Sequence, residues 1–299
     1  MALDRPILIT GTPRSGKSIV TDMLAPASEF ALQDEPLMLW EIGSGSRPDD
    51  RRLADEATEP LCREIRSICE QVVSRSGRQR YLDDLAYHAL RVPFIHRVLP
   101  EARIIHVIRN GEECIPEMLF GWTHKDTFSR AISRRARHIN FKTLPRLALR
   151  FLRNYVRSRV LGRRESWGPR VPGLGEFAAS HSPAQIAAYQ WLIMVRIARE
   201  DLAKLPHERW LEIRHDQLLA DPRGQSRRIS EFCQVRDPCA VIDHAQRLID
   251  PNLVFDRKIQ PPESEWPAIR RIIQPMQEAL GYARSPSAQL TAAACKENQ

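Results

Sequence analysis

An eight-residue loop near the start of the chain constrains the fold more than any other feature. Residues 7–9 read Ile-Leu-Ile, a short apolar run typical of a buried parallel strand. Gly11 and Gly16 then bracket a tight turn, and Lys17 and Ser18 follow where we expect a helix to begin. This spacing satisfies the phosphate-binding-loop pattern. Backbone N–H groups at a helix N-terminus attract an anion. Glycines have no Cβ, so they allow the anion to approach the backbone closely. The sequence therefore predicts a site for a phosphate or sulfate ester of a nucleotide.

The rest of the chain alternates between strand-like and helix-like segments. Strands are expected within residues 29–40, from 81, at 102–109 and at 210–214, and helices at 51–75, 92–99, 183–204, 224–232 and 269–280. This alternation predicts the α/β class: a phosphate-loop protein with a largely parallel sheet flanked by helices.

The 299 residues suit a single domain, which we place at 1–282, with a basic helical insertion at about 125–180 and a disordered tail at 283–299. No apolar run is long enough to span a membrane, and residues 1–5 do not resemble a secretory leader. The six cysteines lack metal-binding spacing. These features predict a cytoplasmic protein with reduced thiols and no metal.

The net charge of +8 is concentrated in one segment. Residues 130–170 hold twelve arginines and Lys142 against a single acid, Glu165. Four of these arginines recur on one face of an expected helix: Arg146, Arg150, Arg153 and Arg157. Such a helix either packs on the core with a solvated basic face, or rests peripherally on an anionic membrane surface. Few aromatic residues interrupt the segment and no nucleic-acid motif occurs, so a nucleic-acid partner is not indicated.

Four segments, in order, resemble the sulfotransferases that use 3′-phosphoadenosine 5′-phosphosulfate (PAPS). Residues 11–28, GTPRSGKSIVTDMLAPAS, resemble the loop that binds the 5′-phosphosulfate, in the form found in bacterial and tyrosylprotein sulfotransferases. Residues 100–111 are similar to the family's strand that ends in arginine. Residues 210–222, WLEIRHDQLLADP, are similar to a second strand motif, and a closing helix ends at Leu280-Gly281-Tyr282.

The resemblance implies roles for individual residues. The donor would be held by Gly11, Thr12, Pro13, Arg14, Ser15, Gly16, Lys17, Ser18 and Arg109. Arg14 would stabilise the transferred sulfuryl group, and Arg109 would contact the 3′-phosphate. Glu35 would take the proton of the acceptor hydroxyl, with its neighbour Asp34 as the alternative base. The reaction would use PAPS as co-substrate without a metal, and a saccharide, lipid-linked or other small hydroxyl acceptor.

Three positions depart from the family pattern. Lys17 replaces a threonine, Glu117 replaces a serine that helps to hold the 3′-phosphate, and Asp84 replaces a lysine near the sulfuryl group. A carboxylate at position 117 would repel a phosphate.

These departures leave two alternatives open. Lys17 and Ser18 would equally serve ATP and Mg²⁺ in a kinase, although no strand clearly ends in the aspartate that such an enzyme needs, and Leu82-Asp83-Asp84 is a poor match. The second alternative is an inactive relative that binds a nucleotide.

Overall fold

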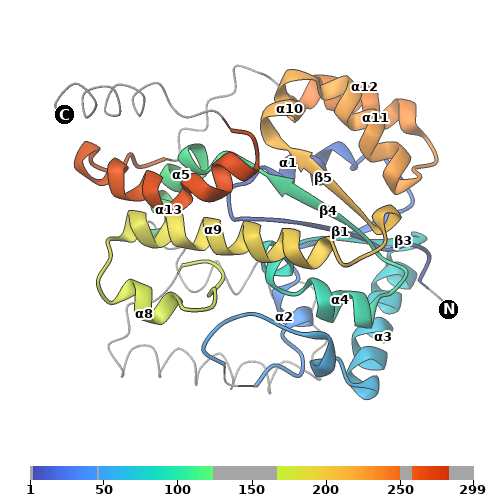
Figure 1. Cartoon of the computed structure of the whole chain (residues 1–299). Helices are drawn as coiled ribbons and strands as arrows, with labels where there is room; N and C mark the ends of the chain where they lie inside the picture. The colour runs from blue at the N-terminus through green and yellow to red at the C-terminus, as the bar shows by residue number, and fades with distance from the viewer. Residues whose placement is uncertain (1–2, 46, 124–166, 250–257, 283–299) are drawn as a thin grey trace.

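Five parallel strands form one sheet at the centre of the protein (Figure 1). The computed structural model describes residues 3–45, 47–123, 167–249 and 258–282. The strands are β1 (Ile7–Gly11), β2 (Phe30–Asp34), β3 (Arg80–Asp84), β4 (Arg103–Ile108) and β5 (Trp210–Arg214). Their order in the sheet is β2-β3-β1-β4-β5, and every neighbouring pair is parallel. This arrangement confirms the predicted α/β class.

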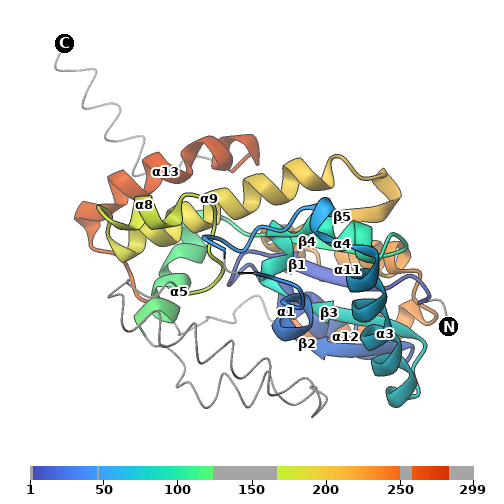
Figure 2. The same cartoon turned by 90° about the horizontal axis from the view of Figure 1, so that it is seen from below.

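Helices cover both faces of the sheet (Figures 1 and 2). They are α1 (Lys17–Met23), α2 (Leu37–Trp40), α3 (Glu59–Ser76), α4 (Val92–Val98), α5 (Gly111–Thr123), α8 (Leu174–Ala178), α9 (Pro183–Leu202), α10 (His215–Ala220), α11 (Pro222–Cys233), α12 (Pro238–Leu248) and α13 (Trp266–Ala279). Short 3-10 turns occur at Ala54–Glu56, Ala86–Leu90, His207–Arg209 and Glu263–Glu265.

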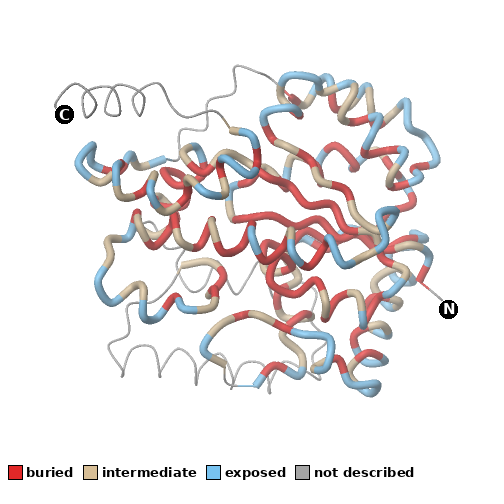
Figure 3. The backbone as a smooth tube through the Cα atoms, viewed as in Figure 1, coloured by how far each residue is buried: buried red, intermediate tan, exposed pale blue. Residues whose placement is uncertain are grey.

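The strands are buried on both faces, which explains their continuous apolar sequences (Figure 3). In β1, Ile7 and Ile9 pack with α1, α11 and α12, whereas Leu8 lies on the opposite face with α3 and α4. A third apolar cluster joins α5, α9 and α13 beyond the end of β4. The core therefore fixes the positions from which the strand ends project.

Helix α9 begins where the sequence predicts. The Ser182 hydroxyl accepts a hydrogen bond from the backbone N–H of Gln185, and the Gln185 side chain accepts one from the N–H of Ser182. This capping box satisfies two otherwise unpaired donors. Further along the helix, the indole N–H of Trp191 donates to the carbonyl of Arg109 at 3.1 Å. The helix thereby secures the residue that follows β4.

Some of the predicted boundaries are wrong. The helix expected at 51–75 begins only at Glu59, because Pro60 in its first turn favours a helix start and Thr58 before it is extended. Helices α2, α10 and α12 were not predicted. The basic segment at 130–165, with its arginine-faced helix, and the tail at 283–299 lie outside the described residues.

Within the described ranges, no helix has both the length and the apolar character needed to cross a membrane. The described cysteines, at positions 62, 69, 114, 233 and 239, are all free thiols.

Candidate active site

The candidate site lies at the carboxyl edge of the sheet, where several strands end. Across this edge Ile9 is in register with Asp84, and Asp84 is in register with Asp34. The phosphate-binding loop leaves β1 here, Glu35 follows β2, and Arg109 follows β4. Open parallel sheets bind their ligands at this edge. The fold thus brings together residues that are far apart in the chain.

The loop after β1 has no room for larger side chains at its two glycines. A Cβ on Gly11 would lie 2.3 Å from the carbonyl oxygen of Val107. Gly16 has φ of +89°, a left-handed conformation that glycine adopts without strain. The loop closes with a hydrogen bond of 3.1 Å from the N–H of Ser15 to the carbonyl of Thr12. Both glycines of the pattern are therefore required by the backbone itself.

The remaining loop side chains divide into exposed and buried groups. Arg14 and Ser18 are exposed, whereas Thr12 and Ser15 are buried. Arg14 has φ of 67°, an uncommon conformation for a residue with a side chain. The Ser15 hydroxyl has no hydrogen-bond partner in the described part of the chain. An anion held by the loop is a chemically suitable partner for that donor.

Lys17 lies beneath the loop and is paired with Asp84. Its ammonium nitrogen is 2.8 Å from Oδ1 of Asp84, and both side chains are less than a tenth exposed. The Thr21 hydroxyl donates to the other carboxylate oxygen of Asp84 at 3.0 Å. Burial alone would lower the pKa of Lys17, but the carboxylates of Asp84, Glu35 and Asp34 outweigh it, and the pKa is raised. Lys17 is therefore a buried, charged ammonium.

The position of Asp84 shows that one expectation from the sequence is wrong, namely that no strand clearly ends in an aspartate. Strand β3 does end in an aspartate, and β3 is a direct neighbour of β1. Leu82-Asp83-Asp84 looked like a poor match because no local pattern shows which strand will lie beside the loop. The carboxylate of Asp84 faces Lys17, so the apparent family departures at 17 and 84 form one pair.

The two candidate bases sit at the end of β2 with different exposures. Asp34 is exposed, whereas Glu35 is half-buried. Glu35 has φ of 45°, and its N–H donates to the carbonyl of Asp84 at 3.2 Å. A left-handed glutamate is a costly conformation that the surroundings must hold in place. Glu35 is thus fixed beside the residue that pairs with Lys17.

Arg109 is engaged by acidic residues of α5. One nitrogen, Nη1, lies 2.7 Å from Glu117 and 3.3 Å from the carbonyl of Arg14, and Nε lies 3.0 Å from Glu113. The bond to the Arg14 carbonyl connects the strand end to the phosphate loop. Arg109 therefore lies directly after β4 and beside the phosphate loop, and carboxylates already bind it.

His215 lies against the loop, a contact that the sequence did not reveal. A Cβ on Gly16 would come within 2.4 Å of its Cδ2 atom. The ring is buried, and its Nε2 has no hydrogen-bond partner among the described residues. Burial, together with Arg109, lowers the pKa of His215 to about 4, so the ring is neutral at pH 7.

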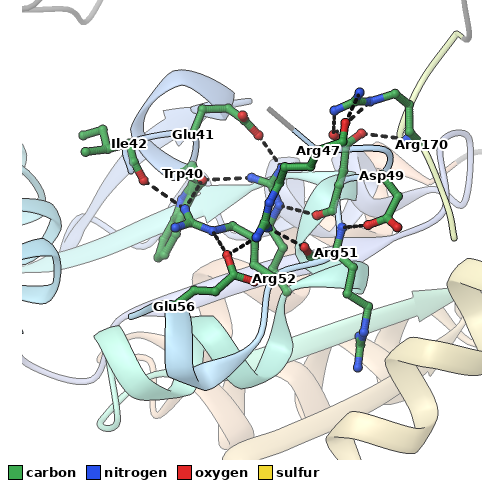
Figure 4. Close-up of polar contacts among 11 residues, drawn as sticks. Trp40, Glu41, Ile42, Arg47, Asp49, Arg51, Arg52, Glu56 and Arg170 are labelled. Carbon is green, nitrogen blue, oxygen red and sulfur yellow. Dashed lines mark hydrogen bonds and ion pairs between the residues drawn. The ribbon is translucent and has the colours of Figure 1, made fainter. Parts of the chain in front are cut away.

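A cluster of arginines secures the segment that follows the candidate bases (Figure 4). We call Arg47, Arg51, Arg52, Arg91 and Arg170 the arginine cluster. Arg52 and Arg91 each donate to the carbonyl of Trp40, the last residue of α2, at 3.0 Å. Arg47 donates to the carbonyl of Arg51, and Arg170 pairs with Asp50, both within the segment after α2, whereas Arg51 pairs with Asp201 of α9. The cluster therefore holds the end of α2, a helix that begins two residues after Glu35.

Among the described residues, no group of three or more histidine, cysteine or acidic side chains is arranged to hold a metal ion.

Comparisons with known proteins agree with this geometry. The profile described as "Sulfotransferase family" matches residues 6–161, just over half of the chain. A sequence search of curated proteins gives no match.

Solved structures share the fold. The sulfotransferase domain from the curacin biosynthetic pathway has a TM-score of 0.52 and 16% identity, over 95% of this chain and 100% of that domain. The sulfotransferase STF9 from Mycobacterium avium has a TM-score of 0.53 and 11% identity, over 93% of this chain and 77% of that protein. The family match covers the loop, both candidate bases, Asp84 and Arg109, so this chain belongs to the sulfotransferase family of enzymes.

Proposed function

We propose that this enzyme transfers a sulfuryl group from PAPS to the hydroxyl group of a small acceptor. The convergence of Arg14, Lys17 and Glu35 at the carboxyl edge of the sheet carries the proposal. The first two are cations in the phosphate loop, and the third is a half-buried carboxylate close enough to Lys17 to raise its pKa. An anionic donor and a hydroxyl that must lose its proton need this combination.

The reaction requires one proton acceptor and one stabilised leaving group. The acceptor oxygen attacks sulfur, the bond between sulfur and the bridging oxygen breaks, and the hydroxyl proton moves to the Glu35 carboxylate. The products are a sulfate ester and adenosine 3′,5′-bisphosphate. Negative charge accumulates on the bridging oxygen, which the guanidinium of Arg14 stabilises by its charge and the ammonium of Lys17 by a hydrogen bond. Asp34, at the same strand end, is the alternative base.

The adenosine part of the donor would lie toward Arg109. Its 3′-phosphate would bind the Arg109 guanidinium, in competition with Glu117 and Glu113. Backbone N–H groups of residues 11–16 and the unpaired hydroxyl of Ser15 would hold the 5′-phosphosulfate.

For the acceptor we propose a saccharide, a lipid-linked molecule or another small hydroxyl compound. The lipid-linked class is favoured by the basic sequence at 130–165, which would contact an anionic membrane surface peripherally. Sedimentation with vesicles of anionic lipid tests this contact. Binding should weaken with salt, since exposed charges are screened over about 10 Å at 0.1 M. No sedimentation at low salt would contradict it.

Isothermal titration with four ligands tests the donor: PAPS, adenosine 3′,5′-bisphosphate, ATP and ATP with Mg²⁺. We expect the first two to bind more tightly than either form of ATP. Tight Mg²⁺-dependent binding of ATP without a response to the bisphosphate would contradict the proposal and favour a kinase. Binding of the bisphosphate without transfer to any of a panel of hydroxyl acceptors would favour an inactive relative.

A further inference from the structure

The transfer end of the site carries more carboxylates than cations. Asp84 lies 2.8 Å from Lys17, and Glu35 and Asp34 both lie close enough to help raise the pKa of Lys17. Arg14 is the only other loop cation, and its side chain is exposed. Three carboxylates thus act on Lys17, at the end of the phosphate loop where the terminal group of a donor would lie.

The Lys17–Asp84 pair is rigid as well as buried. Thr21, one turn after Lys17 in α1, donates from its hydroxyl to Asp84 at 3.0 Å. The backbone of Asp84 is held in β3 between β1 and β2, and its carbonyl accepts the N–H of Glu35. A buried pair of opposite charges contributes almost no net charge to the loop, whereas an unpaired lysine would contribute a full positive charge.

The neutral Lys17–Asp84 pair should distinguish a terminal sulfuryl group from a terminal phosphate, which have the same shape but different charges. The terminal sulfuryl group of a phosphosulfate carries one negative charge at neutral pH. A terminal phosphate carries between 1.5 and 2 negative charges, because its second pKa is about 6. A loop with an unpaired lysine would favour the phosphate. In this protein Lys17 is paired with Asp84, so the phosphate loses that advantage. The nearby carboxylates also repel the additional negative charge of the phosphate.

We infer that Asp84 is a specificity-determining residue, which makes the donor site accept a singly charged sulfuryl group and disfavour a doubly charged terminal phosphate. This inference rests on the proposed function, since it concerns the donor of the same reaction. The two positions that differ from the family pattern, 17 and 84, would then act together. Lys17 supplies a directed hydrogen-bond donor, and Asp84 cancels the long-range charge of that lysine.

The test compares two ligands on one protein. PAPS and adenosine 3′-phosphate 5′-diphosphate differ only in their terminal group. The ratio of their dissociation constants therefore measures how strongly the site prefers one terminal group over the other. Both constants are measured on the same preparation, in the absence of acceptor. We expect the wild-type protein to favour PAPS, and Asp84→Asn to shift the ratio toward the diphosphate by about tenfold. Glu59→Gln changes the net charge equally at an exposed position on α3 and should keep the wild-type ratio.

A second measurement needs no substitution. Between pH 8 and pH 5.5 the terminal phosphate gains a proton and comes to resemble the sulfuryl group in charge. The 3′-phosphate titrates identically in both ligands, and His215, with a pKa of about 4, stays neutral over this range. Wild-type affinity for the diphosphate should therefore rise relative to PAPS as the pH falls. This series applies even if Asp84→Asn does not fold.

The outcomes separate this inference from the function on which it rests. If the wild-type protein binds PAPS but the ratio is the same in Asp84→Asn, or does not change with pH, Asp84 does not set specificity, and the proposed function is unaffected. If the wild-type protein binds ATP and not PAPS, the proposed function fails, and the inference fails with it.

Discussion

The guanidinium of Arg109 lies 2.7 Å from the carboxylate of Glu117, and the two side chains are only 12% and 8% exposed. A second carboxylate, that of Glu113, lies 3.0 Å away but is half exposed. The pair stands at the end of β4, where we propose that the 3′-phosphate of the donor binds. A phosphate must therefore compete with a carboxylate that is already in contact with the arginine.

Replacing Glu117 with glutamine should strengthen the binding of adenosine 3′,5′-bisphosphate by about tenfold, because it removes a buried negative charge next to the phosphate. Affinity for adenosine 5′-phosphate, which lacks the 3′-phosphate, should change little. Isothermal titration measures both. Glu113→Gln provides the matched control, since the same charge is removed at a more exposed position, and should have a smaller effect. Weaker binding to Glu117→Gln would mean that Glu117 is needed to orient Arg109.

Substitutions of Arg14 and Glu35 should affect different steps of the reaction. Arg14→Ala removes a cation from both the bound donor and the leaving group, so KM for PAPS should rise and kcat should fall. Glu35→Gln removes the proton acceptor alone, so kcat should fall by roughly a hundredfold or more with little change in KM. Steady-state kinetics with varied PAPS distinguishes these patterns.

Asp34→Asn is the control for the assignment of the base, because Asp34 is adjacent but exposed. It should retain most of the turnover. Normal turnover in Glu35→Gln together with a large loss in Asp34→Asn would move the base to Asp34. Normal turnover in both would place the base on another residue.

The features that the sequence predicted are local ones. The strand before Gly11, the helix after Lys17 and the start of α9 at Ser182 each depend on residues within a few positions of one another. The same local reasoning placed Arg109 at a strand end, whereas Glu35 was chosen through the family resemblance.

The contacts that could not be predicted from local sequence join distant parts of the chain. Asp84 and Lys17 meet because β3 and β1 are neighbours, and His215 reaches Gly16 because α10 begins directly after β5. No short-range pattern specifies either neighbour. Compared with the family pattern, positions 17 and 84 look like two unrelated differences. Only the order of strands in the sheet shows that the charges of Lys17 and Asp84 neutralise each other.

The contact between Gly16 and His215 leads to a third prediction. Gly16→Ala should lower the free energy of unfolding by about 2 kcal/mol or more, because it combines a left-handed conformation with a clash against the ring. Gly16→Ala/His215→Ala should lose less than the sum of the two single substitutions, since the clash is relieved while the backbone cost remains. Urea unfolding of the four proteins measures this coupling, and strict additivity would contradict the contact.

A last prediction concerns His106, which is fully buried in β4. Neither ring nitrogen has a hydrogen-bond partner within the described ranges. Burial, together with the positive charge of Arg199, lowers the pKa of His106 to about 3. The folded protein therefore keeps this imidazole neutral at pH values where the unfolded chain, with a pKa near 6.5, binds a proton.

Since the pKa of His106 is lower in the folded state, its contribution to stability is complete above pH 6.5 and is lost as the pH falls toward 3. Between pH 7 and pH 5 the free energy of unfolding should decrease by on the order of 2 kcal/mol through this residue. Urea unfolding at pH 7, 6 and 5 measures the slope, which should be shallower in His106→Gln because glutamine does not titrate. The exposed His207, changed to glutamine, is the matched control and should keep the wild-type slope. An unchanged slope in His106→Gln would mean that the imidazole is protonated, or solvated, inside the folded sheet.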